Sequence, residues 1–398
     1  MSEDQINRVT PEEVGFCSKA LRRLTDTICR DVDAGRIPGA VVLVARQGKV
    51  AMLDAFGFSD PDTRSSMRTD AVFRIASLTK PIASVAAMML VERGELALDD
   101  PLGLYIPELS DIRPQTNVEG TRPIKIHDLF RHTTGFTYGF GSSLLDERYR
   151  HLNVLDNRQS TGEFIAKLAQ LGLASVPGTT FEYGVSTDVL GHVIERVLSE
   201  DLERALKHLV LAPLGLQDTS FLLTTASKAR LAQAFRDPAT GERLWMPSYH
   251  ETDEAPTWYS AGGGLLSTAQ DYYTFFQAVL DDHQRNQGRL LARKTLAWMT
   301  SNHLPPGICY GETTPGLGSL APMPDRGQGF GLGFLIRVDA GLNSVPGSVG
   351  EFSWAGISGT HAWVDPQEDI VCVFMMQAPN ERARYRSLIR RMVYASLR

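Results

Sequence analysis

The stretch Ser77-Leu78-Thr79-Lys80 places a hydroxyl group and an amine three residues apart, just before a long apolar segment. On a helix, residues i and i+3 lie on the same face, so the Lys80 amine can reach the Ser77 hydroxyl. A serine hydroxyl attacks a carbonyl only when a neighbouring group takes its proton. Ser-x-x-Lys is common at helix starts, but here it suggests a nucleophilic serine with a base beside it.

Pro81 limits where this helix can begin. Proline is tolerated in the first turn of a helix and disrupts the interior, so the helix is expected to start at about Ser77 and to end at Gly94. Residues 81–91 are apolar nearly all round, which predicts a buried helix. The N–H of Ser77 would then be an unpaired donor at the positive end of the helix, where a developing negative charge is favoured.

The composition is that of an ordinary globular protein. The chain has 398 residues, 43% of them hydrophobic and 22% charged, and a net charge of −6. This charge gives no indication of nucleic acid or an anionic membrane as a partner. The first residues show no basic segment followed by an apolar one, and no apolar run is long enough for a membrane span. We therefore expect a cytoplasmic protein.

The cysteines and histidines predict no metal site and no cofactor. The four cysteines lie far apart without Cys-x-x-Cys spacing, and the nine histidines are scattered without a His-Glu-x-x-His motif. Cys372 lies within an apolar, strand-like run and is expected to be a core residue.

The distribution of elements predicts an α/β domain interrupted by an all-helical one. Helices are expected at residues 18–34, 126–131, 161–171, 187–198, 202–210, 271–281 and 381–397, and strands at residues 40–45, 50–55, 333–338, 359–364 and 370–376. Residues 1–100 and 265–398 would form the α/β domain, and residues 101–264 the inserted, mostly helical one. An active site is expected in the cleft between them.

Two further motifs could complete a site. Tyr183 precedes a predicted helix, where its hydroxyl could enter the cleft and act as a general base, because a nearby ammonium favours the phenolate. In the stretch Trp354-Ala355-Gly356-Ile357, beside an edge strand, the small residues allow close backbone approach, so the N–H of Ile357 could meet a substrate carbonyl and Trp354 could form an apolar wall. Taken alone, each motif is more typical of a structural feature: a packed tyrosine with its hydroxyl at the surface in the first case, and a strand bend with a packed tryptophan in the second.

Taken together and in this order, the three motifs resemble those of serine β-lactamase-like hydrolases: class C β-lactamases, D-alanyl-D-alanine peptidases and, most closely, family VIII carboxylesterases. Ser77 and Lys80 match the nucleophile motif, Tyr183 the tyrosine motif, and residues 354–356 the position of Lys-Thr-Gly in lactamases and of Trp-Gly-Gly in many of the esterases. Residues 131–135, 188–191, 260–265 and 361–366 match further family segments, and the resemblance runs from about residue 15 to the C-terminus.

The resemblance implies a fold and a mechanism. The fold would be an antiparallel β-sheet flanked by helices, with an inserted helical domain. Ser77 would be acylated, Tyr183 with Lys80 beside it would move the proton, and the N–H groups of Ser77 and Ile357 would form the oxyanion hole. Which of Tyr183 and Lys80 is the formal base stays open, because the two would titrate as a coupled pair.

Departures from the lactamase pattern favour an ester substrate. Val185 stands where lactamases have the asparagine of Tyr-x-Asn, and Trp354 where they have the lysine of Lys-Thr-Gly, so two polar groups that bind a β-lactam are replaced by apolar ones. Trp354, Gly356 and Val185 are therefore predicted to contact substrate. An alternative alignment with Tyr259-Ser260-Ala261 as the tyrosine motif is less favoured, because residues 262–264 fit a different family segment.

The leading hypothesis is a carboxylesterase acting on short-chain esters. An acyltransferase to a small-molecule alcohol and a weak β-lactamase are the alternatives on the same scaffold. A catalytically silent, penicillin-binding-like module is the non-enzymatic alternative, and the joint presence of Ser77, Lys80 and Tyr183 argues against it. The chain contains no Gly-x-Ser-x-Gly elbow, which argues against an α/β-hydrolase lipase.

Overall fold

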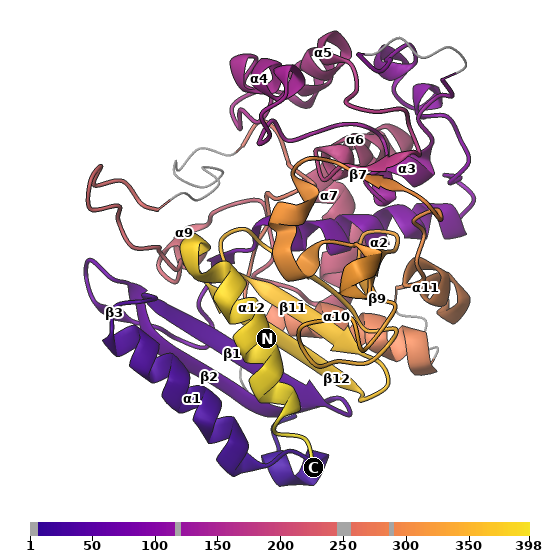
Figure 1. The fold of residues 1–398 in the computed structure, drawn as a ribbon. Helices are drawn as coiled ribbons and strands as arrows, with labels where there is room; N and C mark the ends of the chain where they lie inside the picture. The colour runs from indigo at the N-terminus through magenta and orange to yellow at the C-terminus, as the bar shows by residue number, and fades with distance from the viewer. Residues whose placement is uncertain (1–6, 116–120, 245–255, 286–289) are drawn as a thin grey trace.

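An antiparallel sheet of eight strands, in the order β3-β2-β1-β12-β11-β10-β9-β8, forms the centre of the computed structural model (Figure 1). The structure describes residues 7–115, 121–244, 256–285 and 290–398, so residues 1–6, on which part of the cytoplasmic prediction rests, lie outside it. The strands are β1 (Gly39–Arg46), β2 (Lys49–Asp60), β3 (Ser65–Ser66), β8 (Gln328–Phe330), β9 (Leu335–Arg337), β10 (Phe352–Ala355), β11 (His361–Asp365) and β12 (Ile370–Met376).

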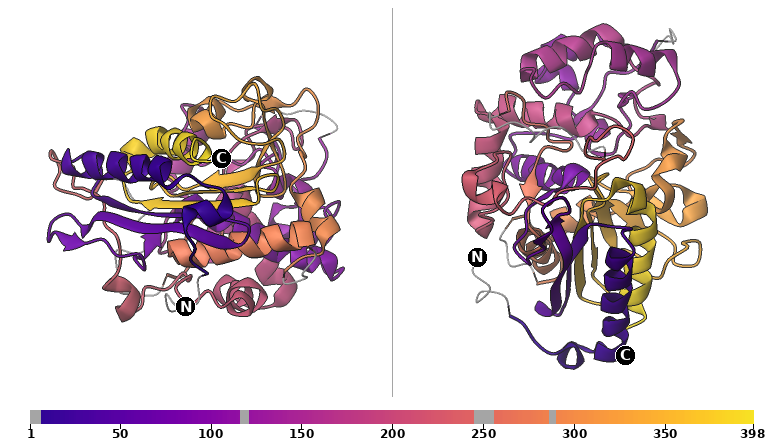
Figure 2. Two further views of the ribbon diagram at one scale, coloured as in Figure 1. Left: turned by 90° about the horizontal axis from the view of Figure 1, so that it is seen from below. Right: turned by 90° about the vertical axis from the view of Figure 1, so that its left-hand side faces the viewer.

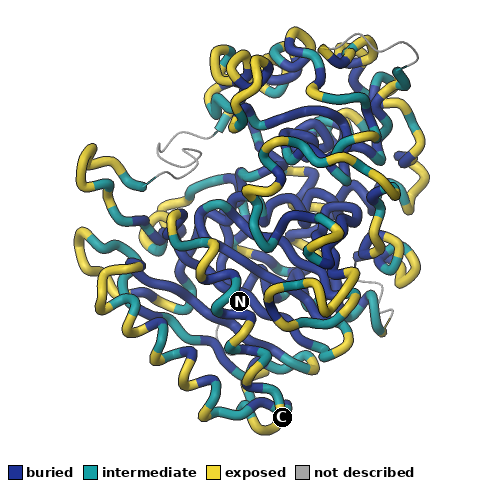
Figure 3. The backbone as a smooth tube through the Cα atoms, in the orientation of Figure 1, coloured by how far each residue is buried: buried dark blue, intermediate teal, exposed yellow. Residues whose placement is uncertain are grey.

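Helices cover both faces of this sheet (Figure 1). Successive side chains of a strand point to opposite faces. In β1, Ala40, Val42 and Val44 pack with α1 (Ser18–Asp33) and α12 (Arg382–Tyr394). The residues between them belong to the core that includes α2 (Thr79–Glu92) and α10 (Ala269–Arg285). Both faces are therefore apolar, and the central strands are buried along their length (Figure 3).

Most of the remaining helices lie beyond one end of the sheet (Figure 2), whereas the short helix Thr225–Lys228 lies apart from them (Figure 1). The remaining helices are α3 (Ile126–Phe130), α4 (Leu144–His151), α5 (Thr161–Leu171), α6 (Ser186–Leu198), α7 (Leu202–Leu206), the π-helical turn η6 (Lys207–Leu211), α8 (Ala212–Leu214) and α9 (Thr225–Lys228); α11 (Arg293–Met299) follows α10. Short 3-10 helices occur at Pro11–Val14, Ala76–Leu78, Leu102–Leu104, Pro107–Leu109, Thr314–Leu320, Pro324–Arg326 and Pro379–Glu381. Throughout the described ranges, no helix has the length and apolar character needed to cross a bilayer.

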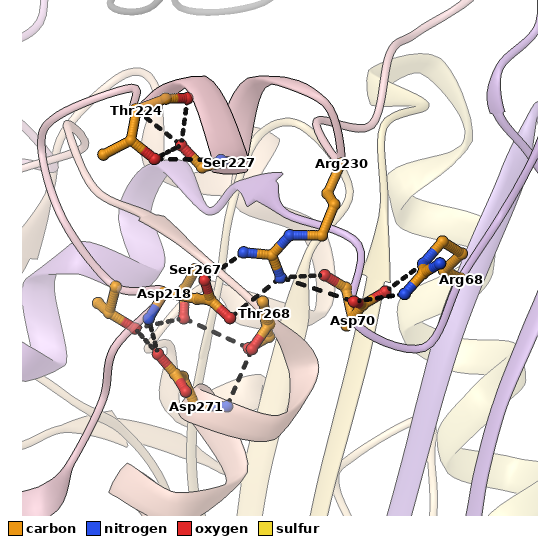
Figure 4. A network of polar contacts seen from close by, with 10 residues as sticks. Arg68, Asp70, Asp218, Thr224, Ser227, Arg230, Ser267, Thr268 and Asp271 are labelled. Carbon is orange, nitrogen blue, oxygen red and sulfur yellow. Dashed lines mark hydrogen bonds and ion pairs between the residues drawn. The ribbon is translucent and has the colours of Figure 1, made fainter. Parts of the chain in front are cut away.

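Two small strand pairs connect the sheet and helical regions near the predicted nucleophile. β4 (Phe73–Arg74) pairs with β6 (Leu266–Ser267), and β5 (Thr180–Phe181) pairs with β7 (Cys309–Tyr310). A polar network lies beside the first pair (Figure 4). The Arg230 guanidinium donates to the Asp218 carboxylate and to the Asp70 backbone carbonyl. The Asp271 carboxylate accepts from the N–H of Asp218 at 2.8 Å.

The predicted fold class is confirmed, and the differences from the predicted elements are local. The nucleophile helix begins as a 3-10 turn at residues 76–78 and becomes α-helical only at Thr79. The predicted helix at 202–210 changes to π geometry at Lys207. β10 and the helices α4 and α11 were not predicted, because four to eight residues show too little periodicity. The core around α2 runs without a break from the sheet into the helical region, and the two-domain division stays a prediction.

Candidate active site

The turn that carries Ser77 is held in an uncommon backbone conformation. Ala76 has φ = 47°, in the left-handed region that residues with a Cβ seldom adopt. Such strain persists only where the surroundings enforce it, and it is frequent at functional sites. Here the Thr79 hydroxyl donates to the Ala76 carbonyl at 2.7 Å, and the Tyr272 hydroxyl donates to the Leu78 carbonyl at 2.8 Å. The turn is thereby fixed with Ser77 facing a cavity.

Lys80 is buried, with 1% of its surface exposed, and its amine has three acceptors. Nζ lies 3.1 Å from Ser77 Oγ, 2.7 Å from the Tyr138 hydroxyl and 2.5 Å from the Gly262 carbonyl. An ammonium has three N–H donors and no acceptor, so this set of partners suits the charged form of lysine.

Tyr183 is the second side chain, after Lys80, that contacts the Ser77 hydroxyl. Its hydroxyl is hydrogen-bonded to Ser77 Oγ at 2.7 Å, and Lys80 Nζ lies 4.9 Å from the centre of its ring. The tyrosine lies between β5 and α6, and its ring packs against Trp354 and His132 with centroid separations of 5.4 and 4.9 Å. The structure therefore brings together the three side chains that sequence reasoning selected as catalytic.

The buried carboxylate of Asp188 holds the backbone segment that carries the Gly262 carbonyl, an acceptor for Lys80. Asp188 Oδ1 accepts from the N–H of Gly262 at 3.0 Å and from the Ser260 hydroxyl. A Cβ at position 262 would lie 2.3 Å from Asp188 Oδ2, so only glycine fits. Burial raises the pKa of Asp188, while the positive charge of Lys80 opposes that rise.

The end of β10 lies beside the serine. β10 is an interior strand, but β9 pairs only with Phe352 and Ser353, so Trp354 and Ala355 have a neighbour on one side only, β11. The predicted edge is therefore correct only for this end of the strand. Beyond it, Ile357 lines the same cavity as Ser77. In the described part of the chain, neither the Ser77 nor the Ile357 N–H donates to another group.

A cavity of about 960 Å³ opens in front of Ser77. Its lining combines the hydroxyl groups of Ser77 and Tyr183 with apolar side chains and with several charged ones. The lining residues are Ala76, Ser77, Tyr138, Phe140, Leu155, Tyr183, Arg236, Asp237, Thr240, Glu242, Arg243, Leu244, Ser260, Gly262, Gly263, Gly316, Leu317, Leu320, Trp354, Ala355, Ile357, Arg382 and Arg386.

Two residues that were predicted to contact substrate do not line this cavity. Val185 is completely buried in the apolar core, because it lies directly before α6 and its side chain packs inward. Gly356 is enclosed as well: a Cβ there would lie 2.4 Å from the Ile75 carbonyl and 2.2 Å from Thr360 Oγ1. Gly356 permits close packing behind the site, whereas Trp354 forms part of the cavity wall, as predicted.

Sequence reasoning missed Tyr138, Asp188 and Arg386 as individual residues. Tyr138 follows the His-Thr-Thr-Gly motif in a stretch rich in glycine and aromatic residues, which is the one signal that could have selected it. Asp188 lies in a segment that was matched to the family but was given no role. Arg386 is one of several arginines in the last helix, and nothing in the sequence distinguishes it from its neighbours.

Glu182, next to Tyr183, makes the stability of the fold depend on pH. Thr313 Oγ1 donates to its carboxyl group at 3.0 Å, and burial raises the pKa from an ordinary value of 4.5 to about 7. The folded state thus binds this proton more tightly than the unfolded state, so the free energy of unfolding falls as the pH rises from about 4.5 to about 7. We expect Glu182→Gln to stabilise the protein by about 2 to 3 kcal/mol more at about pH 8 than at about pH 5.

Urea unfolding at the two pH values measures this difference. Gln keeps an acceptor for Thr313 and has nearly the same volume as Glu, so packing changes little. The same effect of Glu182→Gln at both pH values would contradict the elevated pKa.

Comparison with known proteins agrees with this geometry. A family profile described as Beta-lactamase matches residues 24–395, nearly the whole chain. The chain belongs to the beta-lactamase family. Members of this family at 30% identity or more include esterase EstB of Burkholderia gladioli, which is 31% identical over 350 residues covering 82% of each chain. Protein Rv1367c of Mycobacterium tuberculosis is 32% identical over 361 residues, or 87% of each chain.

A solved structure of the beta-lactamase family superimposes over almost the full length. EstCE1, described as a hydrolase with promiscuous acyltransferase activity, has a TM-score of 0.81 and 29% identity, and the match covers 95% of this chain and 99% of EstCE1. The family and the fold that the motifs indicated are thus confirmed.

Proposed function

We propose that this protein is a serine carboxylesterase that hydrolyses short-chain esters through an acyl-enzyme on Ser77, similar to the family VIII carboxylesterases. The observation that carries this proposal is the contact of Ser77 Oγ with both the Tyr183 hydroxyl, at 2.7 Å, and Lys80 Nζ, at 3.1 Å, at the wall of a cavity. A nucleophile within hydrogen-bond reach of a base, with the base oriented by a third group, is the arrangement that acyl transfer requires.

Tyr183 acts as the base in this mechanism. The Lys80 amine is surrounded by three acceptors, Ser77 Oγ, the Tyr138 hydroxyl and the Gly262 carbonyl, which hold it beside the serine. In the proposed step Tyr183 reacts as its phenolate: its oxygen takes the proton of Ser77 as Oγ attacks the ester carbonyl. The same proton then passes to the departing alcohol.

The N–H groups of Ser77 and Ile357 stabilise the tetrahedral intermediate. Both residues line the cavity, and the Ser77 N–H belongs to the 3-10 turn that leads into α2. Fixed donors of this kind act where negative charge develops, and they lower the barrier by several kcal/mol. Water then enters in place of the alcohol and gives a proton to Tyr183 as it attacks the acyl carbonyl. Tyr183 passes this proton to Ser77 Oγ as the bond between Oγ and the acyl group breaks and the acid product leaves.

Apolar walls around the nucleophile favour an uncharged acyl group. Trp354 is 1% exposed, and its ring packs against Tyr183 and Phe330 with centroid separations of 5.4 and 5.3 Å. Trp354 stands at the position where lactamases carry a lysine, so that positive charge is absent here. The relationship to esterase EstB, at 31% identity, agrees with an ester as the substrate.

An acyltransferase reaction is the second candidate. The cavity is large enough to hold a drug-sized alcohol beside the acyl-enzyme, since ligand pockets commonly measure about 300–1,000 Å³. The description of EstCE1 as a hydrolase with promiscuous acyltransferase activity supports the same possibility for this chain.

A panel of p-nitrophenyl esters, from acetate through butyrate to decanoate, tests both candidates when each ester is assayed with and without added 1-butanol. We expect kcat/KM to be highest for a short chain. A butyl ester formed in the presence of butanol would show transfer, and free acid alone would show hydrolysis. No turnover of any ester, or turnover of a chromogenic cephalosporin as fast as that of the best ester, would contradict the proposed function.

A further inference from the structure

Arg386 places a buried positive charge beside the candidate active site. It lies on α12, lines the same cavity as Ser77, and is only 8% exposed. Within the described ranges, no carboxylate forms an ion pair with it, and its buried Nε has no hydrogen-bond partner. Burial and the neighbouring Arg382 lower its pKa to about 9. A buried charge without a counter-charge is costly, so its location requires a physical reason.

One hydrogen bond of Arg386 suggests that reason. Its Nη2 donates to the Gly356 carbonyl at 2.9 Å. The Gly356 carbonyl and the Ile357 N–H belong to one planar peptide unit, and in a trans peptide these two groups point in opposite directions. The guanidinium therefore holds the carbonyl end of the peptide whose other end is the proposed oxyanion donor.

Two further hydrogen bonds connect the segment that contains Gly356 to the turn that carries Ser77. The Gly356 N–H donates to the Thr360 carbonyl at 2.8 Å, and the Thr360 hydroxyl donates to the Ile75 carbonyl at 3.0 Å. Ile75 is two residues before Ser77. The missing Cβ at Gly356 lets the two backbone segments approach this closely.

We propose that Arg386 is a positioning residue of the oxyanion hole, which orients and polarises the Gly356–Ile357 peptide so that the Ile357 N–H faces the developing oxyanion. This inference rests on the proposed function. A hydrogen bond to the carbonyl of a peptide strengthens its N–H as a donor, because chains of hydrogen bonds polarise one another. The positive charge also favours the negative charge of the tetrahedral intermediate, which supplies the missing counter-charge during the reaction.

Three substitutions at this position separate charge from hydrogen bonding: Arg386→Lys, Arg386→Gln and Arg386→Met. Methionine fills a similar volume, and replacing a buried charge by an apolar group is often tolerated. We expect kcat for p-nitrophenyl butyrate to fall about 10- to 100-fold with Met, less with Gln and least with Lys, with KM changed by less than about threefold, because the lost interaction exists only in the transition state.

The affinity for phenylboronic acid provides a second readout. The boronate forms a tetrahedral adduct with a nucleophilic serine, so its affinity should fall across the three variants in proportion to kcat/KM. Arg384→Gln is the matched control, because Arg384 lies on the same helix, is partly exposed and bonds to Asp31 at 3.0 Å. We expect this control to keep kcat and boronate affinity.

Two results would overturn the inference. One is a folded Arg386→Met enzyme with kcat and boronate affinity within twofold of the wild type. The other is a rise in KM alone, which would make Arg386 a substrate-binding residue. Failure of the proposed function would give a different result: the wild-type protein would then show no ester turnover that is lost in Ser77→Ala. Comparing the wild type with Ser77→Ala therefore distinguishes that failure from the two results above.

Discussion

Ser77→Ala is expected to abolish hydrolysis of p-nitrophenyl butyrate, with a loss in kcat of at least ~10⁴-fold. The substitution removes the oxygen that lies 2.7 Å from the Tyr183 hydroxyl and 3.1 Å from Lys80 Nζ, and no other hydroxyl is bonded to both groups in the part of the chain that the structure describes. Alanine keeps the backbone N–H and adds no atom, so the fold should persist.

Mass spectrometry and circular dichroism complete this test. Wild-type protein quenched during turnover should carry an added acyl mass, and a rapid burst of p-nitrophenol should precede steady turnover if deacylation is slow. The alanine variant should show neither, with an unchanged circular dichroism spectrum and melting temperature. Unchanged turnover by the variant would show that Ser77 is not the nucleophile.

Tyr183→Phe is expected to lower kcat by about 10³-fold, because it removes the oxygen that takes the serine proton. The phenylalanine ring keeps the packing against Trp354 and His132, so the loss should be chemical and not structural. The fold loss should be the same for every ester in the panel, so that the variant keeps the chain-length preference of the wild type, since binding of the acyl group is unaffected.

Tyr138→Phe is the matched control for this prediction. Its hydroxyl lies 2.7 Å from Lys80 Nζ, and its ring makes an edge contact with Tyr183. It should cost only about 10-fold, because Lys80 loses one hydrogen bond of the common size of about 1 kcal/mol. Equal losses from the two tyrosine substitutions would refute the assignment of Tyr183 as the base and would transfer that role to Lys80.

Local patterns predicted much of the fold. The apolar segment after Ser77, the amphipathic helix before β1 and the apolar strands towards both ends of the chain are local features, and the structure confirms them. Short elements such as β10 were not predictable, because four residues carry little periodicity and the strand is fixed by its neighbours β9 and β11.

Of the individual residues predicted for the site, most reach the cavity or contact one another, and some do not. The structure brings Ser77, Lys80 and Tyr183 into contact, and Trp354 and Ile357 into the same cavity. It directs Val185 into the core, because the side chain of the residue before α6 points inward. Val185 does not line the cavity, so its role as a substrate contact stays a prediction, and the argument for an ester now depends on Trp354 and on the surrounding apolar wall.

The sequence by itself determined the chemistry of the nucleophile: Ser77 and Lys80 are one helical turn apart, and this spacing alone sets them on one face. The tertiary structure alone decided what surrounds them. Tyr138 and Gly262 supply acceptors for Lys80, and Arg386 reaches the Gly356 carbonyl from the last helix. These contacts join residues 58, 182 and 30 positions apart. Only folding brings such positions together, so no local pattern could predict them.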